Sequence, residues 1–263
     1  MTTVRDFDRF FAARIPYEMK EDFDNVGLLV GMNDTEVKKV LIALDITSWT
    51  VEEAVSFGAQ LIISHHPLFF SLKRITDSEP TGKTIVSLIS SGISAICLHT
   101  NLDSAAGGVN DALIEMIGAS GMGILDEAHE SKLGAYGIGR YGELPEAETM
   151  TDFLARLKIL LKTNGLRYHD AGRRVSRIAV CGGSGGEFLE KAVSLGCDTY
   201  ITADIKYDRF LTAKELGINL IDADHFCTEN VVVPVLERLA RENFPDVRTK
   251  ISEIHTQTAK FFT

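Results

Sequence analysis

The sequence lacks the long apolar runs and the excess of basic residues that mark two large classes of protein. No run approaches the roughly 20 apolar residues of a transmembrane helix, and charge interrupts the first residues, MTTVRDF, unlike in a signal peptide. The 27 Lys and Arg are outnumbered by 37 Asp and Glu, which makes the formal net charge −10. Nonspecific nucleic-acid binding needs a basic surface. We therefore expect a cytoplasmic protein with neither membrane nor nucleic acid as a partner.

Clustered cysteine is also missing. The four cysteines lie far apart in the sequence and form no CxxC pair; they are Cys97, Cys181, Cys197 and Cys227. Most of them fall in apolar, strand-like segments, which is typical of reduced core thiols in a cytosolic protein. Cys227 differs because it lies between two candidate metal ligands. Without clustered thiolates, a metal site here has to use imidazole and carboxylate groups.

Apolar runs of strand length alternate with helical patterns in the first half of the chain. Residues 40–44, 61–64 and 93–98 read as buried strands. Thr50 and Glu53 have the spacing of a capping box, which predicts a helix that begins there and ends at Gly58. A second helix is expected over 84–91. Strand–helix–strand alternation of this kind indicates a parallel sheet with crossover helices.

The second half of the chain repeats the first. Residues 53–64 match 190–202 with one extra residue, and residues 92–96 match 217–221. Two matches in the same order argue for an internal duplication. We expect an α/β fold of two similar α/β domains with mainly parallel sheets and a metal site in the cleft between them. The predicted domains are residues 1–125 and 126–263, joined near 118–131, with a helix at 231–241 and a strand at 247–254 completing the second.

Two adjacent histidines follow the expected strand at 61–64. Pro67 prevents the strand from continuing, so His65 and His66 stand just beyond its end. Neighbouring strand residues point to opposite faces, and such a pair suits two metal ions better than one. The alternative is that one histidine caps the strand and the other is a solvated loop residue.

The spacing His-x-x-x-carboxylate occurs twice just beyond a buried strand. His99 precedes Asp103 by four residues, and His225 precedes Glu229 by four. Ligands of open parallel sheets gather beyond the carboxyl ends of the strands, where His65 and the other candidates are also expected. Imidazole with carboxylate suits zinc, iron, manganese or cobalt, and a bridging carboxylate is the usual means of holding two ions. Capping histidines are again the alternative.

Two other features have open interpretations. The run Gly182–Gly186 follows an apolar strand and either cradles an anion with its amides or makes a tight turn. Asp45 and Asp204 lie at predicted strand ends and either orient a ligand histidine or cap a helix.

Taken together, these motifs resemble the Nif-three-like family, often named GTP cyclohydrolase 1 type 2 homologues. The resemblance runs nearly from end to end and rests on five segments in order, namely 24–28, 64–67, 99–103, 202–207 and 222–229. It implies two α/β domains with a dinuclear metal centre between them and a toroidal homohexamer. The implied ligands of two divalent ions (zinc, iron or manganese) are His65, His66, Asp103, His225 and Glu229, with Glu229 as the bridge and His99 beside the metals.

The chain also departs from the family pattern. The family often has tryptophan at Phe23, glycine at Ala203 and Asp224, and histidine at Asp208. The change at Asp208 bears most on function, because a histidine there could take part in handling the substrate.

The resemblance implies a metal-dependent hydrolase that is similar to GTP cyclohydrolase 1 type 2. A metal-bound hydroxide would attack a nucleotide or a related small molecule at a carbon–nitrogen bond, and His99 would be the catalytic group that moves protons, since its ordinary pKa of about 6.5 lies near neutrality. The alternative for His99 is a hydrogen-bonding partner that only orients the groups at the metals. The alternatives are a non-enzymatic metal-binding ring for metal storage, metal delivery or assembly, and a nucleotide-binding regulator that uses the glycine run.

Overall fold

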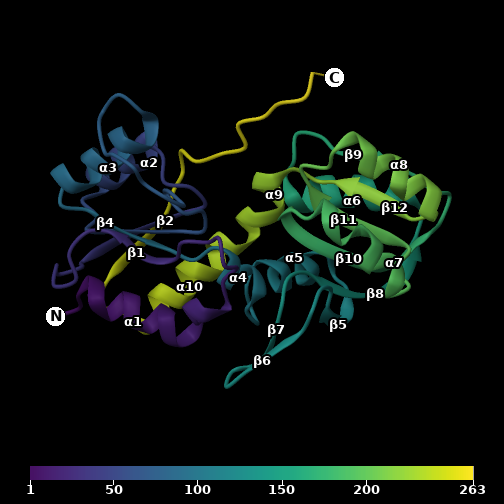
Figure 1. Ribbon diagram of the computed structural model, residues 1–263, viewed down its shortest axis with the longest axis horizontal. Coiled ribbons are helices and arrows are strands. Elements are labelled where there is room, and N and C mark those ends of the chain that lie inside the picture. Colours follow the sequence, from purple (N-terminus) through teal and green to yellow (C-terminus); the bar gives the residue numbers. More distant parts are fainter. Residues whose placement is uncertain (263) are drawn as a thin grey trace. The chain divides into compact units, whose positions relative to one another are not determined.

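The computed structural model describes residues 1–262, the side chain of Met122 excepted, and has a mixed α/β fold (Figure 1). The chain divides into two compact units. The first comprises residues 1–105 and 233–256, and the second comprises residues 106–232 and 257–262. Each unit has its own main sheet. Within the described part of the chain, no helix is long and apolar enough to cross a membrane.

The first unit contains a five-stranded sheet with the order β1-β4-β3-β2-β13. Only the edge strand β1 is antiparallel to its neighbour, and the other three pairings are parallel. The strands are β1 (Gly27–Val30), β2 (Lys39–Ala43), β3 (Leu61–Ser64), β4 (Ser94–Cys97) and β13 (Arg248–Ile251). All four residues of β3 are buried, as expected of a central strand with helices on both faces.

Helices cover both faces of this sheet, with α2 and α3 on one side and α1 and α10 on the other (Figure 1). The helices are α1 (Val4–Arg14), α2 (Ser48–Phe57), α3 (Pro80–Ser90), α4 (Thr100–Ser104) and α10 (Val233–Asn243), with a 3₁₀ turn η1 (Tyr17–Met19). The Phe7 ring stacks on that of Phe244 with a centroid separation of 3.8 Å, which joins the first helix to the segment after α10.

Helix α2 begins two residues before the predicted start at Thr50. Its N-cap is Thr47, whose hydroxyl accepts a hydrogen bond from the Thr50 amide at 3.2 Å. The capping box therefore pairs Thr47 with Thr50 and not Thr50 with Glu53. The predicted end is confirmed, because Gly58 adopts a left-handed φ of 74° that ends the helix.

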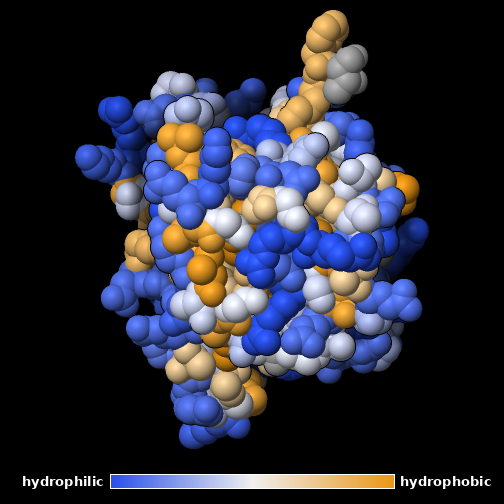
Figure 2. Space-filling model, turned by 90° about the vertical axis from the view of Figure 1, so that its right-hand side faces the viewer, coloured by the Kyte–Doolittle hydropathy of each residue, from blue (hydrophilic) through white to orange (hydrophobic). Residues whose placement is uncertain are grey.

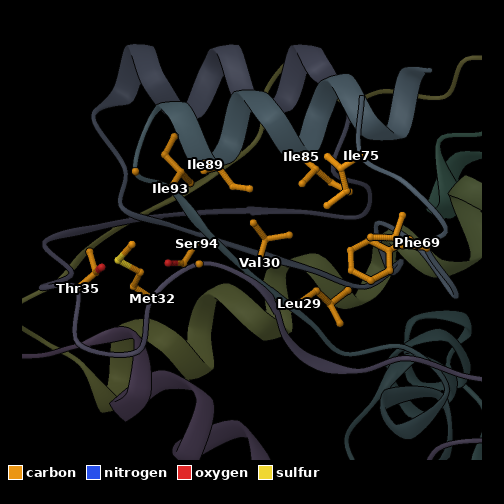
Figure 3. A pocket seen from close by; sticks show the side chains of 13 residues that line it. Leu29, Val30, Met32, Thr35, Phe69, Ile75, Ile85, Ile89, Ile93 and Ser94 are labelled. Carbon is orange, nitrogen blue, oxygen red and sulfur yellow. The ribbon is translucent and has the colours of Figure 1, made fainter. Parts of the chain in front are cut away.

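An apolar pocket of about 410 Å³ lies between β1 and α3 (Figure 3). Its lining is mainly aliphatic and includes Leu29, Ile85 and Ile89, and the hydroxyl-bearing residues in it are Thr35 and Ser94. The residues of this pocket all belong to the first unit.

The second unit contains a six-stranded sheet with the order β5-β8-β10-β11-β12-β9 and a separate hairpin, β6-β7. The strands are β5 (Ser120–Ile124), β6 (His129–Ser131), β7 (Gly134–Tyr136), β8 (Arg140–Glu148), β9 (Arg167–His169), β10 (Val175–Ser184), β11 (Thr199–Ala203) and β12 (Asn219–Asp222). The helical elements are α5 (Val109–Ile117), α6 (Met150–Leu161), η2 (Gly186–Phe188), α7 (Leu189–Ser194), α8 (Tyr207–Leu216), α9 (His225–Glu229) and η3 (Asn230–Val232).

The two units share a run of elements. In the first, β2-α2-β3-α3-β4 forms three parallel strands with antiparallel β1 beside β4. In the second, β10-α7-β11-α8-β12 forms three parallel strands with antiparallel β9 beside β12. The remaining pairings of the second sheet are antiparallel, so that sheet is mixed and not mainly parallel. The duplication itself stays a prediction.

The division of the chain differs from the expected boundary near 118–131. That segment begins at Gly118, the C-cap of α5, and contains strands β5 and β6, and it belongs to the second unit throughout. Helix α10 and strand β13, which were expected to complete the second domain, belong to the first unit, because β13 pairs in parallel with β2 from Arg248↔Lys39 to Ile251↔Ile42. Because β2 and β13 are so far apart in the sequence, no local sequence pattern predicts that they pair.

The surface carries a mixture of polar and apolar side chains. The face shown in Figure 2 is mainly hydrophilic, with apolar patches between the polar side chains. Such a mixture is normal for a folded domain, since polar atoms are too few to cover the whole surface.

Candidate metal centre

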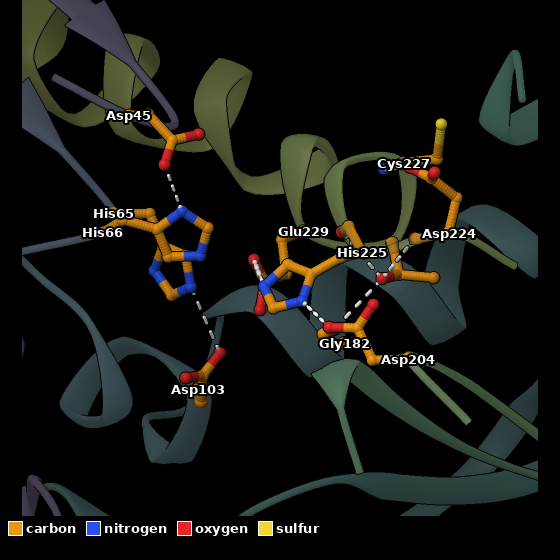
Figure 4. A network of polar contacts seen from close by, with 12 residues as sticks. Asp45, His65, His66, Asp103, Gly182, Asp204, Asp224, His225, Cys227 and Glu229 are labelled. Atoms are coloured by element: carbon orange, nitrogen blue, oxygen red, sulfur yellow. Dashed lines mark hydrogen bonds and ion pairs between the residues drawn. The ribbon is translucent and has the colours of Figure 1, made fainter. Parts of the chain in front are cut away.

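The adjacent histidines of the first unit are fixed directly beyond the end of β3. The backbone amides of His65 and His66 both donate to the carbonyl of Leu44, at 3.1 and 2.9 Å. His65 is fully buried, and its Nδ1 lies 2.8 Å from the Leu98 carbonyl oxygen. His66 Nδ1 lies 2.7 Å from Asp45 Oδ1 (Figure 4). Each ring is thus held by its Nδ1 atom, and Asp45 has the orienting position that was one of its two interpretations.

His99 stands at the N-terminus of α4 and is held by Asp24. Its Nδ1 lies 2.9 Å from Asp24 Oδ1, while the amide and hydroxyl of Thr100 donate to Oδ2 of the same carboxylate at 3.0 and 2.5 Å. Burial alone would raise the pKa of Asp24, but the hydrogen bonds from His99 and Thr100 outweigh it and hold the pKa below its ordinary value. The ionised carboxylate only accepts, so the Nδ1 of His99 donates.

Asp103 lies one helical turn after His99. Its amide donates to the His99 carbonyl at 3.0 Å, and its Oδ1 lies 3.7 Å from Nε2 of His65 (Figure 4). The rings of His65, His66 and His99 offer ligand atoms that all lie within 4.8 Å of one another. The first unit therefore brings together three imidazoles and a carboxylate from two segments of the chain, 65–66 and 99–103.

The second unit contributes His225 and Glu229 from opposite ends of the short helix α9. Their i, i+4 spacing places Nε2 of His225 3.0 Å from Oε2 of Glu229, on one side of the helix. Asp224 caps the helix by accepting the Cys227 amide at 3.1 Å. Nδ1 of His225 lies 2.6 Å from Asp204 Oδ2, so Asp204 also has the orienting position that the sequence left open (Figure 4).

The glycine run of the second unit packs against Glu229 and does not form an open loop. Strand β10 continues to Ser184, so Gly182 and Gly183 belong to it. The Gly182 amide donates to Asn110 Oδ1 at 2.9 Å, and the Gly183 amide donates to the Thr228 hydroxyl at 3.0 Å. These amides are therefore engaged within the protein. A Cβ at residue 183 would lie 2.0 Å from Oε1 of Glu229, which explains the glycine by close packing.

A second support of His66 went unrecognised in the sequence. Nε2 of His255 lies 2.7 Å from Asp45 Oδ2, so one carboxylate holds two imidazoles. Burial alone would raise the pKa of Asp45, but hydrogen bonds from His255 and His66 lower it. No local pattern connects residues 45 and 255. Asp24 and His99 are likewise 75 residues apart, so their contact has no local pattern in the sequence.

A polar pocket of about 580 Å³ opens beside His66 and Asp45. It lies between the start of α2, where Trp49 is exposed, and the start of α3, which contributes Lys83. The pocket belongs to the first unit and is large enough for a small molecule.

Two residues singled out in the sequence lie outside the ligand sets. Cys227 is a buried free thiol, and burial raises its pKa to about 12, so it stays protonated near neutrality. Asp208, which stands where the family often has histidine, is exposed in the first turn of α8.

The chemistry of these side chains fits divalent metal ions. A histidine that binds a metal usually donates its other ring N–H to a carboxylate or a backbone carbonyl, which fixes the ring and its tautomer. All four candidate histidines have this arrangement at Nδ1, which turns Nε2 into the ligand atom; the acceptors are Leu98 O, Asp45, Asp24 and Asp204. The buried His, Asp and Glu clusters could hold metal ions. The joint use of both sets by two ions stays a prediction.

Comparison with known proteins agrees with the resemblance. A family model described as Duf34/NIF3 (NGG1p interacting factor 3) matches residues 2–259. A protein of Clostridium perfringens named GTP cyclohydrolase 1 type 2 homolog is 38% identical over 241 residues, covering 90% of this chain and 91% of its own. A protein of the same name from Lactococcus lactis is 34% identical over 263 residues, covering 98% of both chains.

Solved structures agree on the fold. Staphylococcus aureus protein SA1388 superimposes with a TM-score of 0.90 at 29% identity, covering 99% of each chain. A Bacillus cereus protein described as related to NIF3 superimposes with a TM-score of 0.93 at 24% identity, covering 100% of this chain and 99% of its own. The second likeness bears on the fold alone.

Proposed function

This chain belongs to the Duf34/NIF3 family, and from that premise we propose that it is a metal-dependent hydrolase with a dinuclear centre. The proposed ligands of the two divalent ions are His65, His66 and Asp103 from the first unit with His225 and Glu229 from the second, Glu229 acting as the bridge. Zinc, iron and manganese all suit such a set of imidazoles and carboxylates.

One observation carries the proposal, namely that the proposed ligand histidines are each held at Nδ1. His66 and His225 contact Asp45 and Asp204 at 2.7 and 2.6 Å, and His65 contacts a backbone carbonyl at 2.8 Å. A capping or solvated histidine has no need for a partner that directs Nε2. A second support is the close packing of Gly183 on Glu229, which limits where that carboxylate can lie.

The ions, when bound, would lower the pKa of a water molecule and stabilise negative charge that develops on the substrate. A side chain of the protein has to transfer protons during hydrolysis, and we assign this role to His99. Asp24 accepts a hydrogen bond from Nδ1 of His99, so Nε2 is the ring atom left to take up or release a proton. Its ring lies 5.2 and 5.6 Å from those of His65 and His66, centroid to centroid.

The proposed substrate is a nucleotide or a related small molecule with a carbon–nitrogen bond to be hydrolysed. The name of the clostridial and lactococcal relatives, GTP cyclohydrolase 1 type 2 homolog, supports this class. The polar pocket beside His66 supports a small molecule over a polymer. We also propose the homohexamer implied by the family resemblance, which light scattering after size-exclusion chromatography would test by its mass.

The first experiment is elemental analysis of the purified chain and of Glu229→Gln, followed by a hydrolysis screen with nucleotides and other C–N substrates. The wild type should hold two ions per chain and Glu229→Gln at least one fewer, because a neutral amide of the same size cannot replace a bridging carboxylate. Glu215→Gln, a change at an exposed residue of α8, should keep both ions. Two ions in Glu229→Gln would contradict the bridge.

Turnover is tested with His99→Asn. If His99 moves protons, this variant should keep its ions and lose most of kcat. Exchangeable ions without hydrolysis of any substrate in the screen would instead favour a protein that stores or delivers metal.

A further inference from the structure

An exposed row of aromatic rings leads from the histidine cluster to the surface of the first unit. The ring of Phe70 lies 5.8 Å from that of His99, and the ring of Phe23 lies 6.1 Å from that of Phe70. The row continues inward to His65 and His66, with centroid separations of 5.2 and 5.6 Å from His99. Five rings from three chain segments are therefore in contact in one series.

The outer two rings are far more exposed than phenylalanines that serve the core. Phe23 is 66% exposed and Phe70 is 54% exposed, whereas Phe7 and Phe11 are fully buried. Two neighbouring phenylalanines that are exposed to water do not give the fold the stability that burial of their rings would give. An apolar patch beside a cluster of polar side chains is typical of a binding site.

Hydrogen bonds hold the two chain segments that carry these rings. Asp24, the residue after Phe23, accepts hydrogen bonds from His99 and Thr100. The Asn25 side chain donates to the carbonyl of residue 69, directly before Phe70, at 3.0 Å. The turn that carries the first ring is thereby tied to the loop that carries the second, and both are tied to the proposed catalytic histidine.

We propose that Phe23 and Phe70 form a stacking platform for a planar heteroaromatic ring, such as a nucleobase, of the substrate. The proposal rests on the proposed function and narrows its substrate class. A ring stacked on Phe70 lies next to His99, so the bond presented to the histidine cluster is a carbon–nitrogen bond in the ring or attached to it.

The test is a proton NMR titration of guanosine, adenosine, cytidine and uridine with the full chain as purified, with ribose as the ligand control. At least one nucleoside should show upfield shifts of its base protons, which report stacking over an aromatic face, and ribose should show none. Base–aromatic stacking contributes enough that Phe70→Leu should weaken this binding roughly 5- to 150-fold. Phe70→Trp should keep it, because tryptophan retains a stacking face that leucine lacks.

Tyr168→Leu is the matched control, since Tyr168 is 52% exposed and lies on β9 of the second unit. It should bind the nucleosides like the wild type. Absence of base-proton shifts for all four nucleosides, or equal binding by Phe70→Leu and the wild type, would overturn the proposal. Binding that depends on Phe70 in a protein without hydrolytic activity would uphold the platform and refute the hydrolase, whereas turnover of non-aromatic substrates alone would do the reverse.

Discussion

The contact between Gly183 and Glu229 permits a sharp test of the site in the second unit. Gly183 has a left-handed φ of 64°, and an added Cβ would lie 2.0 Å from Oε1 of Glu229. The backbone there is held on both sides, because the Gly183 amide donates to Thr228 and its carbonyl accepts the Thr202 hydroxyl, both at 3.0 Å. Gly183→Ala must therefore displace the carboxylate or strain the strand.

Gly217 is a matched control for the backbone part of this effect. Its φ is 66°, nearly the same as that of Gly183, but a Cβ added there would have no neighbour within 4 Å. Alanine at a left-handed position lowers the free energy of unfolding by roughly 1–2 kcal/mol, and both variants should show this loss. Overpacking lowers it by about 1–3 kcal/mol more, and only Gly183→Ala should show that further loss. The difference between the two variants therefore measures the overpacking alone.

Urea denaturation in the presence of a chelator measures these losses without a contribution from bound ions. Elemental analysis then follows each variant in the presence of metal. Gly217→Ala should keep both ions, and Gly183→Ala should lose at least one, because the displaced carboxylate is the proposed bridge. If the two variants matched in stability and in metal content, the inferred role of Gly183 would be wrong. Equal stability with metal lost only in Gly183→Ala would mean that Glu229 moves without strain.

The core thiols and the C-terminal strand provide two further predictions. Burial raises the pKa of Cys197 to about 11, and all four cysteines are buried thiols. Ellman's reagent should therefore label none of them in native protein at neutral pH and four after denaturation, and rapid native labelling would contradict the placement of these thiols. Burial alone would raise the pKa of Glu53, but hydrogen bonds from Ser252, the amide of residue 253 and Lys250 lower it below 4.5. Because the pKa is lower in the folded state, the Glu53 carboxylate stabilises the fold above its unfolded pKa, and this stabilisation is lost as the pH falls through the folded pKa. Glu53→Gln should therefore be less stable than the wild type by roughly 1 kcal/mol at pH 7, and the gap measured by thermal unfolding should shrink as the pH falls below about 4; a gap of constant size down to pH 3 would refute this.

The parts of the fold that the sequence predicted are those that local patterns control. The apolar run before His65 forms β3 over Leu61–Ser64, with the histidine pair directly after it. The four-residue spacing of His225 and Glu229 becomes one helical turn of α9 with the two side chains 3.0 Å apart. In both cases the repeat of the local structure, two residues in a strand and about four in a helical turn, was enough to predict where the side chains lie.

Partners that are distant in the sequence escaped prediction. Strand β13 was predicted to belong to the wrong unit because its neighbour β2 lies some 200 residues earlier. The spacing of apolar residues predicts a strand, but it does not show which strand it pairs with. The contact of His255 with Asp45 spans 210 residues. Since a hydrogen bond needs only two suitable atoms at one place in the folded chain, its partner cannot be read from spacing along the sequence.

The carboxylates that hold His99 and His225 show where the similarity of the two units ends. His99 and His225 both follow the third parallel strand of their units, β4 and β12, and each precedes a carboxylate by four residues. Their supporting acids do not correspond, because Asp24 precedes β1 whereas Asp204 follows β11. Each ring needs an acceptor at Nδ1, but any carboxylate within reach meets that need. Corresponding histidines of the two units can therefore occupy similar places after a strand while the residues that orient them differ.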